Sequence, residues 1–207
     1  MENDEPCIDS EKKIFLHVCC GPCAEWPLEY LHLENYQITA FFYNPNIHPV
    51  LENERRLEYA KKLMGLKKIQ LIVKEEYLES LWLEEFASKE FSDRCSMCYL
   101  IRMAESAKNA RENGFHLFTT SLLVSPYQNH QEIIRAGNIA AKKENIKFLP
   151  IDFRDGFRKG QMMAKEDELY RQKYCGCILS LQESKFKDKI EKEFREREFI
   201  ANHAIKE

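Results

Sequence analysis

Seven cysteines stand in three short groups whose spacing suits metal binding. The groups are CCGPC with Cys19, Cys20 and Cys23, RCSMC with Cys95 and Cys98, and YCGC with Cys175 and Cys177. A thiolate is the form of cysteine that binds a metal, and two thiolates separated by two residues can bind one ion or neighbouring corners of one cluster. We therefore expect folding to assemble the three groups into one metal site.

The number of these cysteines favours iron and sulfur over zinc. A closed zinc site takes four ligands and would leave three of the seven cysteines without a role. Seven thiols suit a four-iron cluster with a second centre beside it. Cys19 and Cys20 leave neighbouring backbone positions in different directions, so they could serve two centres. A zinc site and a metal-free dithiol redox pair are the alternatives.

A mononuclear iron usually takes harder ligands than thiolate as well, so a carboxylate is expected near the cysteines. Asp93 stands two residues before Cys95, and Asp152 and Asp155 follow the last predicted strand. Each of these three is equally well explained as a solvated loop carboxylate or a helix cap.

Composition restricts the class of protein. The chain has 207 residues, 44% of them hydrophobic and 31% charged, which is enough to bury a core without disulfides. Its N-terminus, MENDEPCIDSEKK, is acidic and polar, and no apolar run approaches the roughly 18 residues of a membrane span. We expect a cytoplasmic protein with no membrane partner, in which cysteines indicate metal or redox chemistry. A net charge of −3 does not by itself indicate nucleic-acid binding.

The elements that must position these residues alternate between short strands and helices. Predicted strands are Lys13–Val18, Gln37–Tyr43, Lys68–Val73, His116–Thr120 and Lys147–Ile151. Predicted helices are Ala24–Leu33, Val50–Met64, Glu76–Ser88, Met97–Asn113 and Gln128–Glu144, with Gly65 and Gly114 expected to end two of them. This alternation predicts an α/β fold with a doubly wound, mostly parallel, five-stranded Rossmann-like sheet.

We expect a single domain over residues 1–207. Residues 1–12 form a variable N-terminal tail. Residues 152–207 form a loop and helical C-terminal extension that completes the metal site and ends in a charged helix near Ser184–Glu198.

Three loops should meet at the carboxyl edge of the sheet, where ligands of such folds bind. CCGPC follows the first strand, NPNIHP (44–49) the second and TSLLVSPYQNH (120–130) the fourth. His48 and His130 lie in these loops, where they could contact substrate or donate a proton. His17 lies within the first strand and is expected to be a core histidine. Asn44 and Asn46 could instead brace their turn.

Aromatic and basic residues near the motifs suit an RNA substrate. Tyr127 and Tyr174 could stack on an unstacked base, with packing under the loops as the alternative. A basic stretch beside YCGC could contact phosphates, although such runs are usually solvated surface. Its members are Arg154, Arg158, Lys159, Arg171 and Lys173.

The order of the motifs carries a family resemblance. CCGPC, FFYNPNIHP, DRCSMCYLIR, TTSLLVSPYQNH, DFRDGF and YRQKYCGCILS follow one another between about Lys13 and Ser184. In this the chain resembles the QueH family of epoxyqueuosine reductases. The resemblance implies an adenine nucleotide alpha hydrolase-like fold and cobalamin-independent reduction of epoxyqueuosine to queuosine at the tRNA wobble position, the last step of queuosine biosynthesis.

The resemblance also implies cofactors, partners and roles. It implies a 4Fe-4S cluster beside a mononuclear iron, bound by the seven cysteines, and we expect a low-potential electron donor of ferredoxin or flavodoxin type. We expect Cys19, Asp93 and His130 to be catalytic. We expect the substrate to be bound by Asn44, His48, Tyr127, Tyr174 and Arg154.

Two other functions remain open. A related tRNA thiolase would use ATP, but its loop after the first strand cradles pyrophosphate with glycine and serine amides, and here that loop is CCGPC. A non-catalytic zinc module that holds tRNA or a partner would be colourless, whereas an iron–sulfur protein would be brown.

Overall fold

The computed structural model of the chain describes residues 12–78, 82 and 91–204, with the side chains of 91–93 and 198–204 outside that description. The strands are β1 (Lys13–Val18), β2 (Gln37–Phe42), β3 (Gln70–Val73), β4 (Leu117–Thr120) and β5 (Lys147–Phe148). All five predicted strands are present, and those after β1 are one to three residues shorter than expected.

The five strands form one parallel sheet in the order β3-β2-β1-β4-β5. β1 lies at its centre, where Leu16 pairs with Ala40 of β2 and with Thr119 of β4. Its residues after Lys13 are buried, as expected of a strand covered on both faces. The strand order reverses between β1 and β4, so a crevice is expected at their carboxyl ends. The predicted doubly wound architecture is confirmed.

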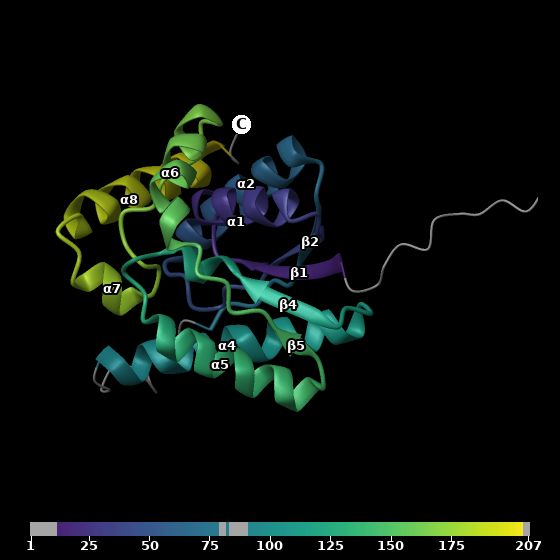
Figure 1. The fold of residues 1–207 in the computed structure, drawn as a ribbon. Coiled ribbons are helices and arrows are strands. Elements are labelled where there is room, and N and C mark those ends of the chain that lie inside the picture. Colours follow the sequence, from purple (N-terminus) through teal and green to yellow (C-terminus); the bar gives the residue numbers. More distant parts are fainter. Residues whose placement is uncertain (1–11, 79–81, 83–90, 205–207) are drawn as a thin grey trace, which may run out of the picture.

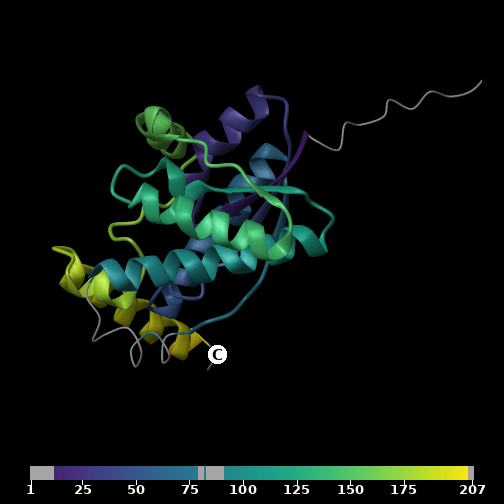
Figure 2. The same cartoon turned by 60° about the horizontal axis from the view of Figure 1, so that its bottom comes forward.

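Helices cover both faces of this sheet (Figure 1). Among the described residues, the helices longer than one turn are α1 (Gly21–Leu33), α2 (Val50–Lys67), α4 (Phe91–Glu112), α5 (His130–Glu144), α6 (Phe157–Glu166), α7 (Ile178–Gln182) and α8 (Lys187–Ala204). α1 and α2 lie on one face, and α4 and α5 lie together on the other, as the turned view also shows (Figure 2).

The C-terminal helices lie at the end of the sheet toward which β4 points (Figure 1). α6 packs on α1, and the contact depends on a glycine that precedes it. A Cβ at Gly156 would lie 2.0 Å from the Trp26 ring, so no other residue fits without moving that ring. This packing brings the chain back over the carboxyl edge before Cys175.

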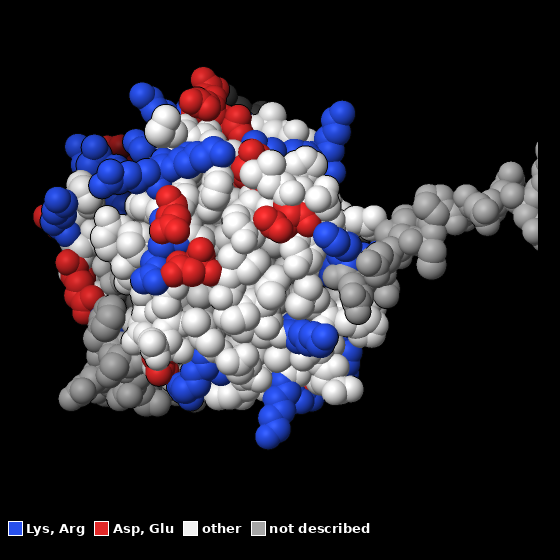
Figure 3. Space-filling view, viewed as in Figure 1, with Lys and Arg blue, Asp and Glu red and all other residues white. Residues whose placement is uncertain are grey.

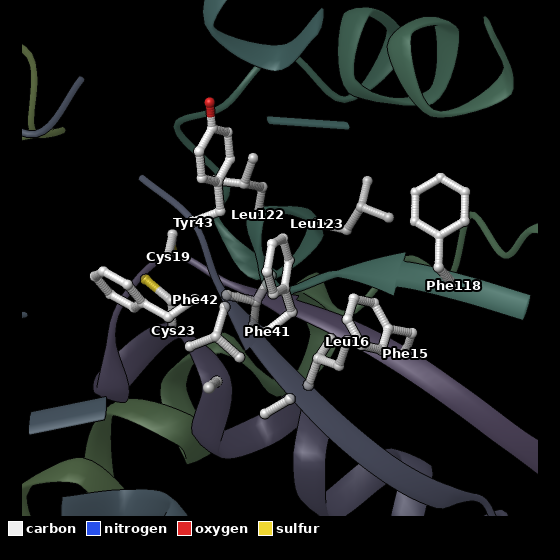
Figure 4. Packing of buried hydrophobic residues seen from close by; sticks show 14 of the residues in the cluster. Phe15, Leu16, Cys19, Cys23, Phe41, Phe42, Tyr43, Phe118, Leu122 and Leu123 are labelled. Carbon is white, nitrogen blue, oxygen red and sulfur yellow. The ribbon is translucent and has the colours of Figure 1, made fainter. Parts of the chain in front are cut away.

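The hydrophobic core runs along the sheet and reaches the first cysteine group (Figure 4). Phe15, Phe41 and Phe118 are fully buried on neighbouring strands. Cys19 and Cys23 belong to the same buried cluster at its carboxyl end. The first cysteine group is therefore supported by the core and does not depend on a mobile loop.

Two local predictions were wrong. Gly65 does not end α2, which continues to Lys67 because Lys68 itself adopts the left-handed conformation (φ 56°) that closes the helix. The loop expected at CCGPC is mostly helix, because α1 begins at Gly21, three residues before the predicted Ala24, with Pro22 in its first turn, where proline is favoured. Gly114, with φ 76°, follows α4 as predicted.

The predicted helix Glu76–Ser88 falls largely outside the described residues. Among the described helices, none is long and apolar enough to cross a membrane.

Candidate metal centre

The first cysteine group converges where β1 passes into α1. Cys20 directly precedes α1 and Cys23 lies in its first turn. The sulfurs of Cys19, Cys20 and Cys23 all lie within 4.8 Å of one another. The Sγ atoms of Cys19 and Cys20 are 3.8 Å apart, so the expectation that they leave in different directions is wrong. The chain turns from strand to helix at this point, and the turn brings neighbouring side chains together.

The three buried thiols differ in pKa. Hydrogen bonds from the thiols of Cys20 and Cys23, and one from the Ser121 hydroxyl, hold the pKa of Cys19 well below its usual value. Burial raises the pKa of Cys20, and hydrogen bonds with Cys19 and Cys20 raise that of Cys23. The group therefore holds one thiolate readily, and binding a cation would release the other protons.

The second and third groups lie beside each other. Cys95 and Cys98 are one turn apart on α4 and so share a face of the helix. Burial, with a smaller contribution from the nearby Cys175 and Cys177, raises the pKa of Cys95 to about 12 and that of Cys98 to about 11, and Arg102 opposes the rise at Cys98. Cys177 caps α7, and its Sγ accepts the backbone N–H of Ser180 at 3.4 Å.

All three groups reach one cavity of about 980 Å³. The cysteines that line it are Cys19, Cys23, Cys95, Cys98 and Cys175. Such a concentration of soft ligands in one hollow suits iron–sulfur chemistry. The donor set therefore fits the expected group.

Side-chain amides donate hydrogen bonds to these sulfurs from three separate segments. Gln172 Nε2 lies 3.3 Å from Cys23 Sγ, and Gln128 Nε2 lies 3.4 Å from Cys175 Sγ. Asn46 Nδ2 lies 3.1 Å from Cys98 Sγ. None of these contacts was expected from the sequence, although Asn46, Gln128 and Gln172 all lie within the quoted motifs.

A buried arginine holds the YCGC loop. Arg56 pairs with Glu52 at 2.7 Å, and its guanidinium donates to the carbonyl oxygens of Cys175 at 2.8 Å and Tyr174 at 3.1 Å. Gly176 has φ 142° and lies against Arg56, so the loop requires glycine between its cysteines. Neither Arg56 nor Glu52 was singled out from the sequence.

NPNIHP holds the same loop from the other side. His48 is fully buried, its backbone N–H donates to Gly176 O at 2.8 Å, and its Nδ1 accepts the N–H of Ile178 at 3.1 Å. The Tyr174 hydroxyl donates to the carbonyl oxygen of His48. His48 and Tyr174 therefore support the YCGC loop. For Tyr174 this is the alternative of packing under the loop, and for His48 it differs from the expected contact with substrate.

The other predicted residues fall into distinct settings. Asn44 is buried and donates to Val18 O at 2.9 Å, so it braces the turn. His17 is a core histidine as predicted, with hydrogen bonds to Thr120 and Tyr43. Tyr127 lines the cavity, is 85% exposed, and meets the Phe157 ring edge-on.

His130 and Arg154 are not among the described residues that line the cavity. His130 begins α5 and bonds to Ser125 O at 3.0 Å. Arg154 pairs with Asp152, and the hydrogen bonds it donates lower the pKa of that carboxyl to about 2. Asp93 lies in the first turn of α4, and its side chain lies outside the described residues. Of the described carboxylates, Glu132 lines the cavity, and it was missed.

Comparisons with known proteins agree with this arrangement. The family model described as "Epoxyqueuosine reductase QueH" matches residues 14–183. The protein of that name from Dehalococcoides mccartyi is 32% identical over 168 residues, covering 81% of this chain and 92% of the relative. The protein of the same name from Streptococcus pyogenes is 36% identical over 178 residues, covering 80% of this chain and 69% of the relative.

A solved structure shares the fold. The U34-tRNA thiolase NcsA from Methanococcus maripaludis, solved with its [4Fe-4S] cluster, superposes with a TM-score of 0.50 at 16% identity, over 78% of this chain and 58% of that one. This likeness confirms the adenine nucleotide alpha hydrolase-like fold. The family match covers the strands, the carboxyl-edge loops and all three cysteine groups. This chain therefore belongs to the QueH family of epoxyqueuosine reductases, which are oxidoreductases.

Proposed function

We propose that this chain reduces epoxyqueuosine to queuosine in tRNA with a four-iron cluster and a second iron bound by its three cysteine groups. The observation that carries the proposal is the single cavity onto which all three groups open. The reaction adds two electrons and two protons to the epoxide, breaks both of its C–O bonds, and yields an alkene and one water molecule.

The spacing of the sulfurs suggests how the ligands divide. Metal–sulfur bonds of about 2.3 Å place two thiolates of a tetrahedral ion about 3.8 Å apart. The Cys19–Cys20 separation of 3.8 Å has this value. We therefore assign Cys19, Cys20 and Cys23 to the single iron and the other four cysteines to the cluster, and Asp93 is retained as the candidate carboxylate.

The chemistry that the protein itself cannot supply would come from the metals. When bound, the cluster would provide electrons one at a time, and the single iron would provide a Lewis acid for the epoxide oxygen. The chain's own residues hold and shield this site. Cys19 and Asp93 are the proposed catalytic ligands, and His130 is the proposed proton donor, for which a shift of its side chain away from Ser125 O is required.

Substrate contacts are proposed at the rim of the cavity. Tyr127 presents an exposed ring on which a base can stack. Arg171 and Lys173 line the cavity and suit phosphate contacts. Lys and Arg side chains also gather over α6 and α8 at the upper left of Figure 3. Arg154 is a weaker candidate for a phosphate contact because its guanidinium already forms an ion pair with Asp152.

The division of the chain and the remaining partners follow from this assignment. Residues 152–207 contribute Cys175 and Cys177, so we propose that this extension completes the site within a single domain. A low-potential ferredoxin or flavodoxin is the proposed electron donor, and the cytoplasm, where tRNA is modified, is the proposed location.

The test is anaerobic purification with iron and sulfide analysis, followed by incubation with epoxyqueuosine-containing tRNA and dithionite. We expect more than four irons per chain and queuosine in the nucleosides of digested tRNA, with no requirement for ATP. A colourless, zinc-only protein would support the interaction module instead. Strict dependence on ATP would support thiolase-like chemistry. Reconstitution that never exceeds one metal per chain would refute the two-centre site.

A further inference from the structure

Asn46 connects a buried arginine to a cysteine sulfur. Its Oδ1 accepts hydrogen bonds from Arg102 Nε at 3.0 Å and Nη2 at 2.8 Å, and its Nδ2 donates to Cys98 Sγ at 3.1 Å. The orientation of this amide is unambiguous, because arginine can only donate and so must face the oxygen. The N–H group of Asn46 therefore points at the sulfur.

Arg102 carries a charge that the described protein does not neutralise. Its side chain lines the cavity and the residue is 3% exposed, yet it forms no ion pair with a carboxylate in the part of the chain that the structure describes. A buried cation is costly unless a negative group lies nearby. The amide of Asn46 joins the Arg102 guanidinium to Cys98 Sγ, and Arg102 lines the same cavity as Cys98, so a thiolate at Cys98 would supply the missing negative charge.

Other amides reach sulfurs without such a charge behind them. Gln172 and Gln128 donate to Cys23 and Cys175, and within the described part of the chain no hydrogen bond links either side chain to a cation. The pair of Arg102 and Asn46 is therefore distinct among the described donors, because it presents both an N–H group and a full positive charge to the same sulfur.

We propose that Arg102 and Asn46 raise the reduction potential of the iron–sulfur centre that Cys98 binds, and so set how readily it takes an electron. The inference rests on the proposed function, because it needs an iron centre at Cys98. When one electron passes from a low-potential donor to the centre, the centre becomes more negative by one charge and no bond to Cys98 changes. A nearby cation and an N–H donor stabilise that reduced form.

The test measures the midpoint potential of anaerobic, iron-loaded protein by dye-mediated titration with electron paramagnetic resonance. Asn46→Asp replaces the donor with a carboxylate that also neutralises Arg102. Asn46→Ala removes the donor and the oxygen that accepts from Arg102, and it adds no negative charge. We expect more negative potentials for both. For Asn46→Asp the ratio of reduced to oxidised centre at a given potential should fall at least tenfold, which is 59 mV for one electron.

Asn53→Ala is the matched control. Asn53 Nδ2 donates to Asn44 O at 2.7 Å and supports the same loop without a contact to sulfur or to Arg102. The midpoint potential of Asn53→Ala should equal that of the unsubstituted protein. If Asn46 only braced the loop, the Asn46 variants would also have the midpoint potential of the unsubstituted protein. If Asn46→Asp loads no iron, Asn46→Ala and Arg102→Gln decide the matter.

Two kinds of failure are distinguishable. Unchanged midpoints in variants with full iron and sulfide content would overturn this inference and leave the proposed reductase intact. An unsubstituted chain that never acquires an iron–sulfur centre would refute the proposed function, and the inference with it.

Discussion

Replacing Arg56 with Met tests how the YCGC loop is held. The side chains of Arg56 and Glu52 are 2% and 0% exposed, so the substitution leaves a buried carboxylate whose remaining side-chain partner is the Tyr170 hydroxyl at 3.0 Å. Breaking a buried pair in this way costs about 3–5 kcal/mol. For a domain of this size, about 4 kcal/mol lowers the melting temperature by roughly 8–16 °C.

The assay is urea unfolding of metal-free protein, since a bound cofactor would prevent two-state analysis. Glu52→Gln combined with Arg56→Met is the matched control, because it removes the buried charge and should recover about 2 kcal/mol. Hydrogen exchange of the loop amides should also rise in the single variant, since Cys175 O and Tyr174 O lose their donor. A loss below about 1 kcal/mol, or a double variant no more stable than the single one, would refute the reasoning.

Three further predictions concern the cavity and its rim. Cys19→Ser should stay folded by circular dichroism, because the core supports its strand, while losing all epoxyqueuosine reduction; an unfolded or fully active variant contradicts its catalytic role. Tyr127→Ala should weaken tRNA binding about tenfold in filter binding and Tyr127→Phe should not, because only the ring is needed for stacking; equal affinities would remove the stacking role. Arg171→Gln with Lys173→Gln should lower the salt dependence of tRNA binding by about 1–2 in log–log slope, whereas Arg154→Gln, whose cation is already paired, should change it little; the opposite order would move the phosphate contact to Arg154.

The sequence by itself determined the sheet and the edge at which its motifs meet. KIFLHV forms β1 over the expected residues, because a strand buried on both faces of a parallel sheet must be continuously apolar. Parallel strands end at the same edge, so CCGPC, NPNIHP and the loop after β4 were expected to be neighbours. These inferences need only local periodicity and the general geometry of parallel sheets.

Local signals were less reliable where two residues could perform the same task. Gly65 is a good helix terminator, but Lys68 adopts the left-handed conformation three residues later and ends α2 there. The convergence of Cys19 and Cys20 was also missed, since it depends on where strand gives way to helix.

Only the tertiary structure decided what surrounds the sulfurs. Asn46 reaches Cys98 across 52 positions of sequence, and Arg56 reaches the carbonyl of Cys175 across 119. His48 became a support of the YCGC loop because Gly176 and Ile178 pack against it. Such contacts join residues whose local patterns carry no information about each other, because the distance between them is set by the packing of whole helices on the sheet.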